Sequence, residues 1–272
     1  MKKKRTDIIL ILVFITGLSL LLYPSVSDYW NSLHQSRAVA SYAEEVAKLD
    51  DSDYEKLWDE AEAYNRTLSE GVGRFVFNEE EAEKYNALLD ISGNGIMSYI
   101  EIPNLACVLP IYHGTSEEVL QIAIGHIEGS SLPVGGKSSH CVLSGHRGLP
   151  SAKLFSDLDQ LREGDVFMIR TLDTTLTYEV DQIRIVLPHE INEIEIVKGE
   201  DLCTLVTCTP YGVNSHRLLV RGHRIENLED AFDIRITADA MQIDPAIVAP
   251  VLAIPVLLLL LIWMIIYYRK RR

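Results

Sequence analysis

The sequence predicts a mainly β protein, a closed barrel or a sandwich, and three features of its 272 residues lead to this prediction. From residue 98 onward, short runs rich in β-branched and aromatic residues alternate with turns. Helical periodicity is confined to the region before those runs. Two long apolar segments lie near the ends of the chain, where they suit a membrane better than a soluble core.

The N-terminal apolar run covers residues 8–23 and follows the basic stretch MKKKR. It is just short of the roughly 20 residues that span a bilayer. Ser25-Val26-Ser27 fits a small-x-small cleavage site. Residues 1–27 are therefore either a signal peptide or an uncleaved membrane anchor, and the sequence leaves both interpretations open.

The C-terminal apolar run, residues 246–268, carries no charge and is followed by a basic tail, residues 269–272. It is long enough to span a bilayer with some tilt. Trp263, Tyr267 and Tyr268 gather toward its basic end, where an aromatic belt is expected. We therefore expect a C-terminal transmembrane helix. Basic residues at the outer ends of both apolar runs place both termini in the cytoplasm and the domain between them outside.

The charge and the cysteines narrow the class of protein. A formal net charge of −14 argues against nucleic acid or anionic lipid as partners. Four cysteines in an exported domain allow two disulfides, although a domain of this size has little need of them. No C-x-x-C pair is present, so we predict no metal site and no cofactor. The cysteines are Cys107, Cys141, Cys203 and Cys208.

Residues 28–97 form the predicted helical N-terminal region. Residues 36–65 are polar, with apolar positions at helical spacing, and read as one helix. The stretch SEGVGRFVF interrupts this pattern, and NEEEAEKYNALLD starts a new helix. Asn78 is the expected N-cap of that helix, because acidic residues fill the turn after it.

Residues 98–226 hold the β-rich runs, which are separated by spacers containing Gly, Pro, Asn and Ser. Seven or more short strands with few helices favour a barrel or a sandwich. Residues 151–161, SAKLFSDLDQL, predict one short amphipathic helix between strands, and residues 227–245 predict a linker to the C-terminal run. The predicted strands are SYIEI, CVLPIY, HCVLS, DVFMIRT, TLTYEVDQIRIVLP, LCTLVTC and RLLVRGHR.

Cys208 is the last residue of the predicted strand LCTLVTC, directly before the turn TPYGVNSH. If this strand pairs with RLLVRGHR as a hairpin, Cys208 and Arg217 both lie at the mouth of the loop. A thiol at a strand end beside a cation is a candidate nucleophile, while an inert thiol, half of a disulfide and a metal ligand stay open as alternatives. Alternation along the strand places Cys203, Leu205 and Thr207 on one face, and Thr204, Val206 and Cys208 on the other.

A nucleophilic thiol needs a proton partner, and the chain has eight histidines. His146 follows a predicted strand in CVLSGHRGLP, between two glycines that allow close approach of the backbone to a substrate. His126 has a similar glycine setting in GHIEGSSLPVGG. Spacing favours His146 and leaves His126 as the second candidate.

Several motifs together carry a family resemblance. TLVTC, NSHRLLVRG and the upstream LSGHRGLP resemble the active site of sortases, the cysteine transpeptidases of Gram-positive cell surfaces. With YIEIPNLACVLPIYHGTSEEVL and GHIEGSSLPVGG, they resemble the class C, pilin-polymerising branch over about residues 98–224. The resemblance implies a closed sortase-type β-barrel of about eight strands over residues 98–226. A two-anchor topology is also seen in that branch.

Position by position, the resemblance makes Cys208 the nucleophile, His146 the catalytic histidine and Arg217 the arginine of the site. It implies a membrane-anchored enzyme that cleaves an LPXTG-like sorting signal between Thr and Gly and holds the peptide as a thioacyl intermediate. Transfer to a lysine of another pilin then builds a covalent pilus, so the implied partners are pilin precursors with sorting signals and acceptor lysines. Further substrate-binding candidates are Ser144, Leu205 and Thr207.

The sequence departs from the resemblance at the lid. Pilin-type sortases commonly carry an Asp-Pro-aromatic motif in an N-terminal lid, and here the only Asp-Pro is Asp244-Pro245. The corresponding place, roughly residues 69–78, offers Phe75 or Phe77 as lid candidates. The alternative is an ordinary helix–helix connection with a packed aromatic ring. We therefore expect a more open cleft.

Two other functions compete with a transpeptidase. In a cysteine endopeptidase, water rather than an amine would resolve the thioacyl intermediate. The order of histidine before cysteine counts against a papain-like enzyme of that kind. In a non-enzymatic surface module, the cysteines would be structural and Cys208 would resist alkylation.

Overall fold

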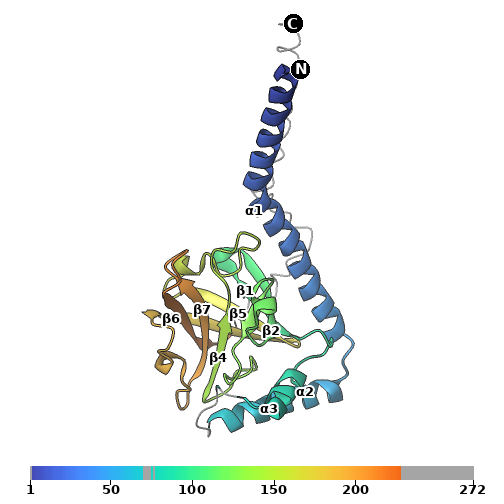
Figure 1. The fold of residues 1–272 in the computed structure, drawn as a ribbon. Coiled ribbons are helices and arrows are strands. Elements are labelled where there is room, and N and C mark those ends of the chain that lie inside the picture. Colours follow the sequence, from blue (N-terminus) through green and yellow to red (C-terminus); the bar gives the residue numbers. More distant parts are fainter. Residues whose placement is uncertain (1, 70–74, 76, 228–272) are drawn as a thin grey trace.

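The computed structural model describes residues 2–69, 75 and 77–227. Three helices precede a β-barrel: α1 (Lys2–Val46), α2 (Asp51–Ser69) and α3 (Glu79–Ala87). Figure 1 shows α1 passing along the side of the barrel and extending beyond it toward the N-terminus, while α2 and α3 lie across one end. The predicted C-terminal transmembrane helix, residues 246–268, and the basic tail lie outside the described residues.

Helix α1 is longer than the sequence pattern indicated. It runs without interruption from Lys2 to Val46, through Pro24, so the apolar run and the polar segment after it form one helix. The predicted helix over residues 36–65 is wrong in its bounds, because the chain breaks between α1 and α2. Asp50 accounts for the break: its Oδ1 accepts a hydrogen bond from the N–H of Asp53 at 2.9 Å and caps α2.

Polar contacts tie α2 to the barrel region and cap the start of α3. The Asn65 side chain on α2 accepts from the Leu132 N–H at 2.7 Å and donates to the Leu132 carbonyl at 3.1 Å. Asn78 caps α3 as predicted, in a capping box in which it accepts from the Glu81 N–H and its own N–H donates to the Glu81 carboxylate.

Eight strands close into a barrel in the order β1-β2-β3-β4-β7-β8-β6-β5, which confirms the predicted fold class. The pairs β2–β3 and β4–β7 are parallel, and the other pairs are antiparallel. Short helical turns connect the strands: η1 (Pro103–Leu105), α4 (Glu117–Leu120), η2 (Leu158–Gln160) and η3 (Asn192–Ile194). The strands are β1 (Ile96–Ile102), β2 (Cys107–His113), β3 (Ile124–His126), β4 (Ser139–Ser144), β5 (Val166–Thr171), β6 (Thr174–Val186), β7 (Asp201–Thr209) and β8 (His216–Ile225).

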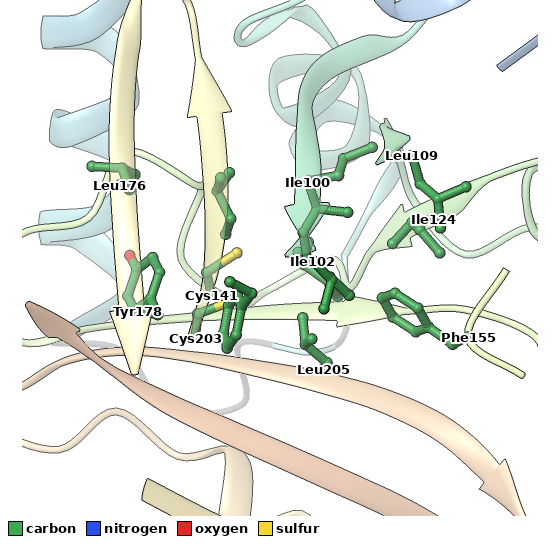
Figure 2. Close-up of a cluster of buried hydrophobic side chains, with 14 of the residues drawn as sticks. Ile100, Ile102, Leu109, Ile124, Cys141, Phe155, Leu176, Tyr178, Cys203 and Leu205 are labelled. Atoms are coloured by element: carbon green, nitrogen blue, oxygen red, sulfur yellow. The ribbon is translucent and has the colours of Figure 1, made fainter. Parts of the chain in front are cut away.

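The barrel interior is filled by large apolar side chains, and Figure 2 shows Ile100, Phe155 and Leu205 among them. Cys203 on β7 also points inward, while Val206 lies on the other face in a separate apolar cluster. This confirms the predicted alternation along β7 for these residues. The interior packing fixes the register of β7, because a shift of one residue would turn its inward-facing residues to the other face of the sheet.

The predicted amphipathic helix over residues 151–161 is wrong. The segment consists of turns that end in η2. Leu154 has a positive φ of 39°, outside the helical region, and the Phe155 N–H donates to the carbonyl of His146 at 3.1 Å. Burial of Leu154, Phe155 and Leu158 therefore decides this backbone against local helix propensity.

Candidate active site

Strands β4 and β7 are parallel neighbours and end at the same end of the barrel. Beyond the last β4 residue, the Gly145 N–H donates to the carbonyl of Val206 at 3.0 Å. The Thr207 hydroxyl donates to the carbonyl of Gly145 at 2.7 Å. These two hydrogen bonds continue the side-by-side arrangement of the two chains one residue past the end of β4. His146, the next residue, therefore lies beside Cys208 near the end of β7.

Gly145 is required for this close alignment. A Cβ atom at position 145 would lie 2.6 Å from the Ile124 side chain and 2.7 Å from the Phe155 ring. Such distances are too short for carbon–carbon contact, and both neighbours belong to the packed core. Because Gly145 has no side chain, the backbone after β4 can pack directly against these core residues.

Arg217 is the direct cross-strand neighbour of Cys208. Strands β7 and β8 pair antiparallel with Cys208 opposite Arg217, which confirms the hairpin predicted from sequence. Directly opposed residues have side chains on the same face of the sheet. Nη1 of Arg217 donates to the carbonyls of Asn214 and His216 at 3.2 and 3.1 Å, which holds the guanidinium at the mouth of the hairpin loop.

The imidazole of His146 has a free hydrogen-bonding position. Its Nε2 atom is buried, yet it makes no hydrogen bond within the described part of the chain. Buried polar atoms are nearly always paired, so an unpaired one calls for an explanation. Cys208 is half-buried at the adjacent strand end. The ends of β4 and β7 and the start of β8 thus bring together a thiol, an imidazole and a guanidinium, the groups needed for nucleophilic acyl transfer.

Arg147, which sequence analysis did not single out, connects the two strand ends. Its Nη1 donates to the Thr209 hydroxyl at 3.3 Å, and its Nη2 pairs with the Asp159 carboxylate. Arg147 directly follows His146 and Thr209 directly follows Cys208, so this hydrogen bond joins the two strand ends. The motif GHRGLP contains this arginine, but its partner Asp159 is twelve positions away, which no local pattern indicates.

His126, the second histidine candidate, has a structural role. It is fully buried, its Nδ1 is 2.8 Å from the Tyr85 hydroxyl, and its Nε2 is 2.9 Å from the Ser131 carbonyl. Both ring nitrogens therefore have protein partners. Tyr85 comes from α3, so this histidine fastens α3 to β3.

The predicted substrate-binding residues differ in their surroundings. Leu205 is fully buried in the barrel interior, where it packs the core. Thr207 is buried, and its hydroxyl is committed to Gly145. Ser144 is half-buried at the end of β4. A substrate-binding role for these residues stays a prediction.

Of the lid candidates, Phe77 packs edge-on against Tyr85, with ring centroids 5.7 Å apart. It also contacts the main hydrophobic core, as expected of a packed helix–helix connection. Phe75 is half-buried. Residues 70–74 and 76 lie outside the described residues, so the open cleft stays a prediction.

The remaining cysteines are free thiols; Cys141 and Cys203 are buried opposite each other on β4 and β7, and Cys141 also interacts with the His126 imidazole. Burial raises the pKa of Cys107 to about 12 and also raises the pKa of Cys203. Both groups therefore stay protonated at neutral pH and are poor nucleophiles. Within residues 2–69, 75 and 77–227, no group of three or more His, Cys, Asp or Glu side chains is arranged to hold a metal ion.

Comparison with known proteins agrees with this geometry. Residues 100–225 match the family model of the sortase domain. The crystal structure of sortase C1 from Streptococcus agalactiae is 53% identical, with a TM-score of 0.69, and the match covers 71% of this chain and 100% of that one. Sortase C from Streptococcus pneumoniae is 42% identical, with a TM-score of 0.63, covering 70% of this chain and 97% of that one.

Two further relatives extend the comparison. Clostridium perfringens sortase C, solved with the C-terminal cell wall sorting motif, is 40% identical, with a TM-score of 0.63, covering 71% of this chain and 100% of that one. Sortase A from Bacillus anthracis is 28% identical over 221 residues, which are 81% of this chain and 95% of that protein. These matches overturn the alternative of a non-enzymatic surface module. The chain belongs to the sortase family of cysteine transpeptidases, and the solved structures that it resembles are class C sortases.

Proposed function

We propose that this protein is a membrane-anchored sortase that joins pilin subunits, with Cys208, His146 and Arg217 as its catalytic residues. The observation that carries the proposal is the arrangement of side chains at the ends of β4 and β7 and the start of β8. There, Arg217 faces Cys208 across the hairpin, and the buried Nε2 of the adjacent His146 has no partner among the described residues.

In the first half of the reaction, His146 takes the thiol proton and Cys208 attacks the Thr carbonyl of an LPXTG-like signal. A free thiol is only a few per cent ionised at neutral pH, and neighbouring cations favour the reactive anion. The tetrahedral intermediate then collapses, and the Thr–Gly C–N bond breaks. His146 returns the proton to the departing Gly amine, which leaves a thioester on Cys208.

Arg217 is suited to stabilise the oxyanion of that intermediate. Within the described part of the chain, the Arg217 side chain donates both of its hydrogen bonds through Nη1, so its Nε and Nη2 atoms are left for a ligand. A guanidinium stays charged throughout the cycle, and a donor aimed at the developing charge contributes about 3–4 kcal/mol to the transition state.

In the second half, a lysine amine of another pilin attacks the thioester. His146 accepts the proton that the amine loses, the C–S bond breaks, and an isopeptide bond joins the two subunits. Two relatives support this substrate class. The work on Streptococcus pneumoniae sortase C concerns pilin substrate specificity, and Clostridium perfringens sortase C was solved with a cell wall sorting motif.

An apolar cluster lies on the outer face of the barrel, on the face of β7 that also carries Cys208. Its members Val142, Val206 and Leu219 are buried, and Ile127, Val186 and Ile194 pack against them as partly buried residues. The apolar Leu and Pro of an LPXTG-like signal would have to contact these partly buried side chains for the Thr–Gly bond to reach the strand end.

The anchor in this proposal is α1. Among the described residues, one helix, over Leu10–Val46, is long and apolar enough to cross a membrane, by length and composition. We propose that residues 1–27 stay on the protein as an anchor and that residues 28–97 and 98–226 lie outside the cell. In this arrangement, the linker 227–245 leads to a second span over residues 246–268, which places the C-terminus in the cytoplasm.

The test uses the full chain in detergent micelles with a peptide that bears an LPXTG-type signal. Intact-protein mass spectrometry should show a thioacyl adduct in the wild type and in Cys203→Ala, but not in Cys208→Ala. A lysine-bearing pilin fragment should then discharge the adduct into an isopeptide product. Discharge by water alone would support the endopeptidase alternative, and an adduct that persists in Cys208→Ala would refute the assignment of the nucleophile.

A further inference from the structure

Helix α1 is fastened to the loop that begins at the proposed catalytic histidine. We call this loop, residues 146–155, the His146 loop. The Lys153 N–H donates to Oδ1 of Asp28 on α1 at 2.7 Å, and the Asn31 side chain donates to the Ser151 carbonyl at 2.7 Å. Within the loop, the Phe155 N–H donates to the His146 carbonyl at 3.1 Å, so the loop is closed on itself. The histidine is therefore coupled to a defined point on α1.

That point lies where a membrane-spanning segment would end. Positions 8–27 contain no charged residue, and Asp28 is the first charge after Asp7. Twenty helical residues rise about 30 Å, which equals the hydrocarbon thickness of a bilayer. Since α1 continues as one helix past this point, Asp28 and the His146 loop would lie at the level of the lipid headgroups.

The surface around this point has the chemistry of a membrane interface. Tyr29 and Trp30 are 47% and 62% exposed, and Tyr and Trp prefer the interface because their rings are apolar and their tips polar. A hollow of about 200 Å³ lies between α1 and the barrel, lined mostly by apolar groups including Trp30, Ile122 and Ala123. Ile122 is 48% exposed. Covering this apolar surface with lipid would be favourable, because apolar surface that is exposed to water carries a free-energy cost.

We propose that the His146 loop and the adjoining hollow form a docking surface for the interfacial region of a phospholipid bilayer. This inference rests on the proposed role of α1 as an anchor. It adds that the catalytic end of the barrel faces the membrane, so the enzyme meets its sorting signal where a membrane-held substrate leaves the bilayer. The contact depends on aromatic and apolar groups rather than on charge, so the net charge of −14 does not oppose binding to zwitterionic lipid.

Depth-dependent quenching of tryptophan fluorescence tests this surface directly. The full chain is placed in phosphatidylcholine vesicles whose acyl chains carry bromine at shallow or deep positions. One variant, Trp58→Phe with Trp263→Phe, keeps Trp30 as its single reporter. A second variant has all three native tryptophans changed to Phe and carries Pro150→Trp, at an exposed position of the His146 loop.

The matched control places the reporter at the other end of the barrel. Val197→Trp, in the same tryptophan-free background, lies at a 45% exposed position in the segment that leads into the start of β7. Melting temperatures of all variants establish that they fold. The readout needs no catalysis, so it is independent of the proposed reaction.

We expect shallow bromines to quench Trp30 and the Pro150→Trp reporter at least about twofold more than the Val197→Trp reporter, because interfacial groups lie about 5–10 Å deep. If Trp30 is not quenched, α1 does not span the bilayer, and the anchor and the docking surface both fail. If Trp30 is quenched but the Pro150→Trp and Val197→Trp reporters behave alike, the anchor stands and the docking surface is refuted.

Discussion

The two ends of the β4–β7 pair are built from the same two strands but differ in whether their buried polar groups have hydrogen-bond partners. At the starting end, the Asp201 carboxylate accepts hydrogen bonds from the Gly136 N–H at 2.9 Å and the Tyr178 hydroxyl at 3.0 Å. At the finishing end, the Nε2 atom of His146 is buried without a partner among the described residues, and Cys208 is half-buried. We call these the paired end and the unpaired end.

The difference separates structure from chemistry. Leaving a buried polar atom unpaired costs about 1–3 kcal/mol, so it persists where the group serves another purpose. At the paired end, the Asp201 carboxylate has hydrogen-bond partners and anchors the loop before β4. Cys203 and Cys208 repeat the contrast within one strand, since Cys203 is fully buried in the core and Cys208 lies five positions along at the unpaired end. A change at the unpaired end should therefore reduce catalysis, and a change at the paired end should reduce stability.

The largest expected effect comes from Cys208→Ala. Because no other group in the proposed site can form the thioester, kcat for transfer should fall by about 10⁴-fold or more, while the melting temperature stays the same. The paired control is Cys203→Ala, which should keep its kcat and lose about 1 kcal/mol of unfolding free energy. Transfer assays and thermal melts on both variants check this, and equal losses of kcat in the two would remove the contrast.

His146→Gln should have the next largest effect. Glutamine keeps a polar side chain but cannot carry a proton between thiol and amine, so kcat should fall by about 10²–10⁴-fold. His126→Gln is the matched control, because that imidazole is bonded to Tyr85 and Ser131. It should lower the melting temperature with little loss of kcat. The measurement is kcat of both variants from steady-state kinetics, normalised to the folded fraction of each protein. The prediction fails if His126→Gln lowers kcat as much as His146→Gln does.

Arg217→Ala should lower kcat by about 10²–10³-fold through loss of oxyanion stabilisation. Arg217→Lys keeps the charge but loses the planar fork of donors, so it should recover only part of the activity. The comparison is made on kcat/KM with one peptide. Full recovery by lysine would show that charge alone matters, and an unaffected Arg217→Ala would exclude Arg217 from the transition state.

Asp159→Asn should have a smaller effect, through position rather than chemistry. It weakens the ion pair that holds Arg147 between the two strand ends, so kcat should fall by about tenfold with KM unchanged. Asp157→Asn is the control, since it removes the neighbouring Lys153–Asp157 pair without touching Arg147. A rise in KM with constant kcat would indicate lost substrate binding instead of displaced catalytic groups.

Asp201→Ala, at the paired end, should have the smallest effect on transfer. It leaves the Gly136 N–H and the Tyr178 hydroxyl without their acceptor, so unfolding free energy should fall by about 1–3 kcal/mol. Activity per folded molecule should stay within about twofold, because this end lies a full strand away from Cys208. Denaturant titration and active-site-normalised kinetics measure the two quantities. A loss of activity comparable to that of Asp159→Asn would mean that the two ends are not independent.

Local patterns in the sequence were sufficient for the features that depend on neighbouring residues. Alternation along β7 separated Cys203 from Val206, and the hairpin around TPYGVNSH placed Cys208 opposite Arg217. The cap at Asn78 followed from its acidic first turn. In each case, the deciding interaction lies within one strand, one hairpin or one helical turn.

Features decided by distant partners were missed. The three-residue β3 is too short for a period-2 pattern and is defined by its pairing with β2 and β4. The segment around Phe155 has helical periodicity, yet burial and the contact with His146 hold it in turns. The structural role of His126 depends on Tyr85, which is 41 positions away. Such partners become visible only when the barrel brings them together.

The measurement that tests the central claim most directly is the rate at which each cysteine of the native protein reacts with iodoacetamide, resolved by peptide mapping. Cys208 is half-buried at the unpaired end, while Cys141 and Cys203 are buried in the barrel and burial raises the pKa of Cys107 to about 12. We expect Cys208 alone to be labelled before unfolding, more slowly in His146→Gln, and all four cysteines to be labelled afterwards. Native Cys208 that resists labelling, or that reacts no faster than Cys203, would contradict the assignment of chemistry to the unpaired end.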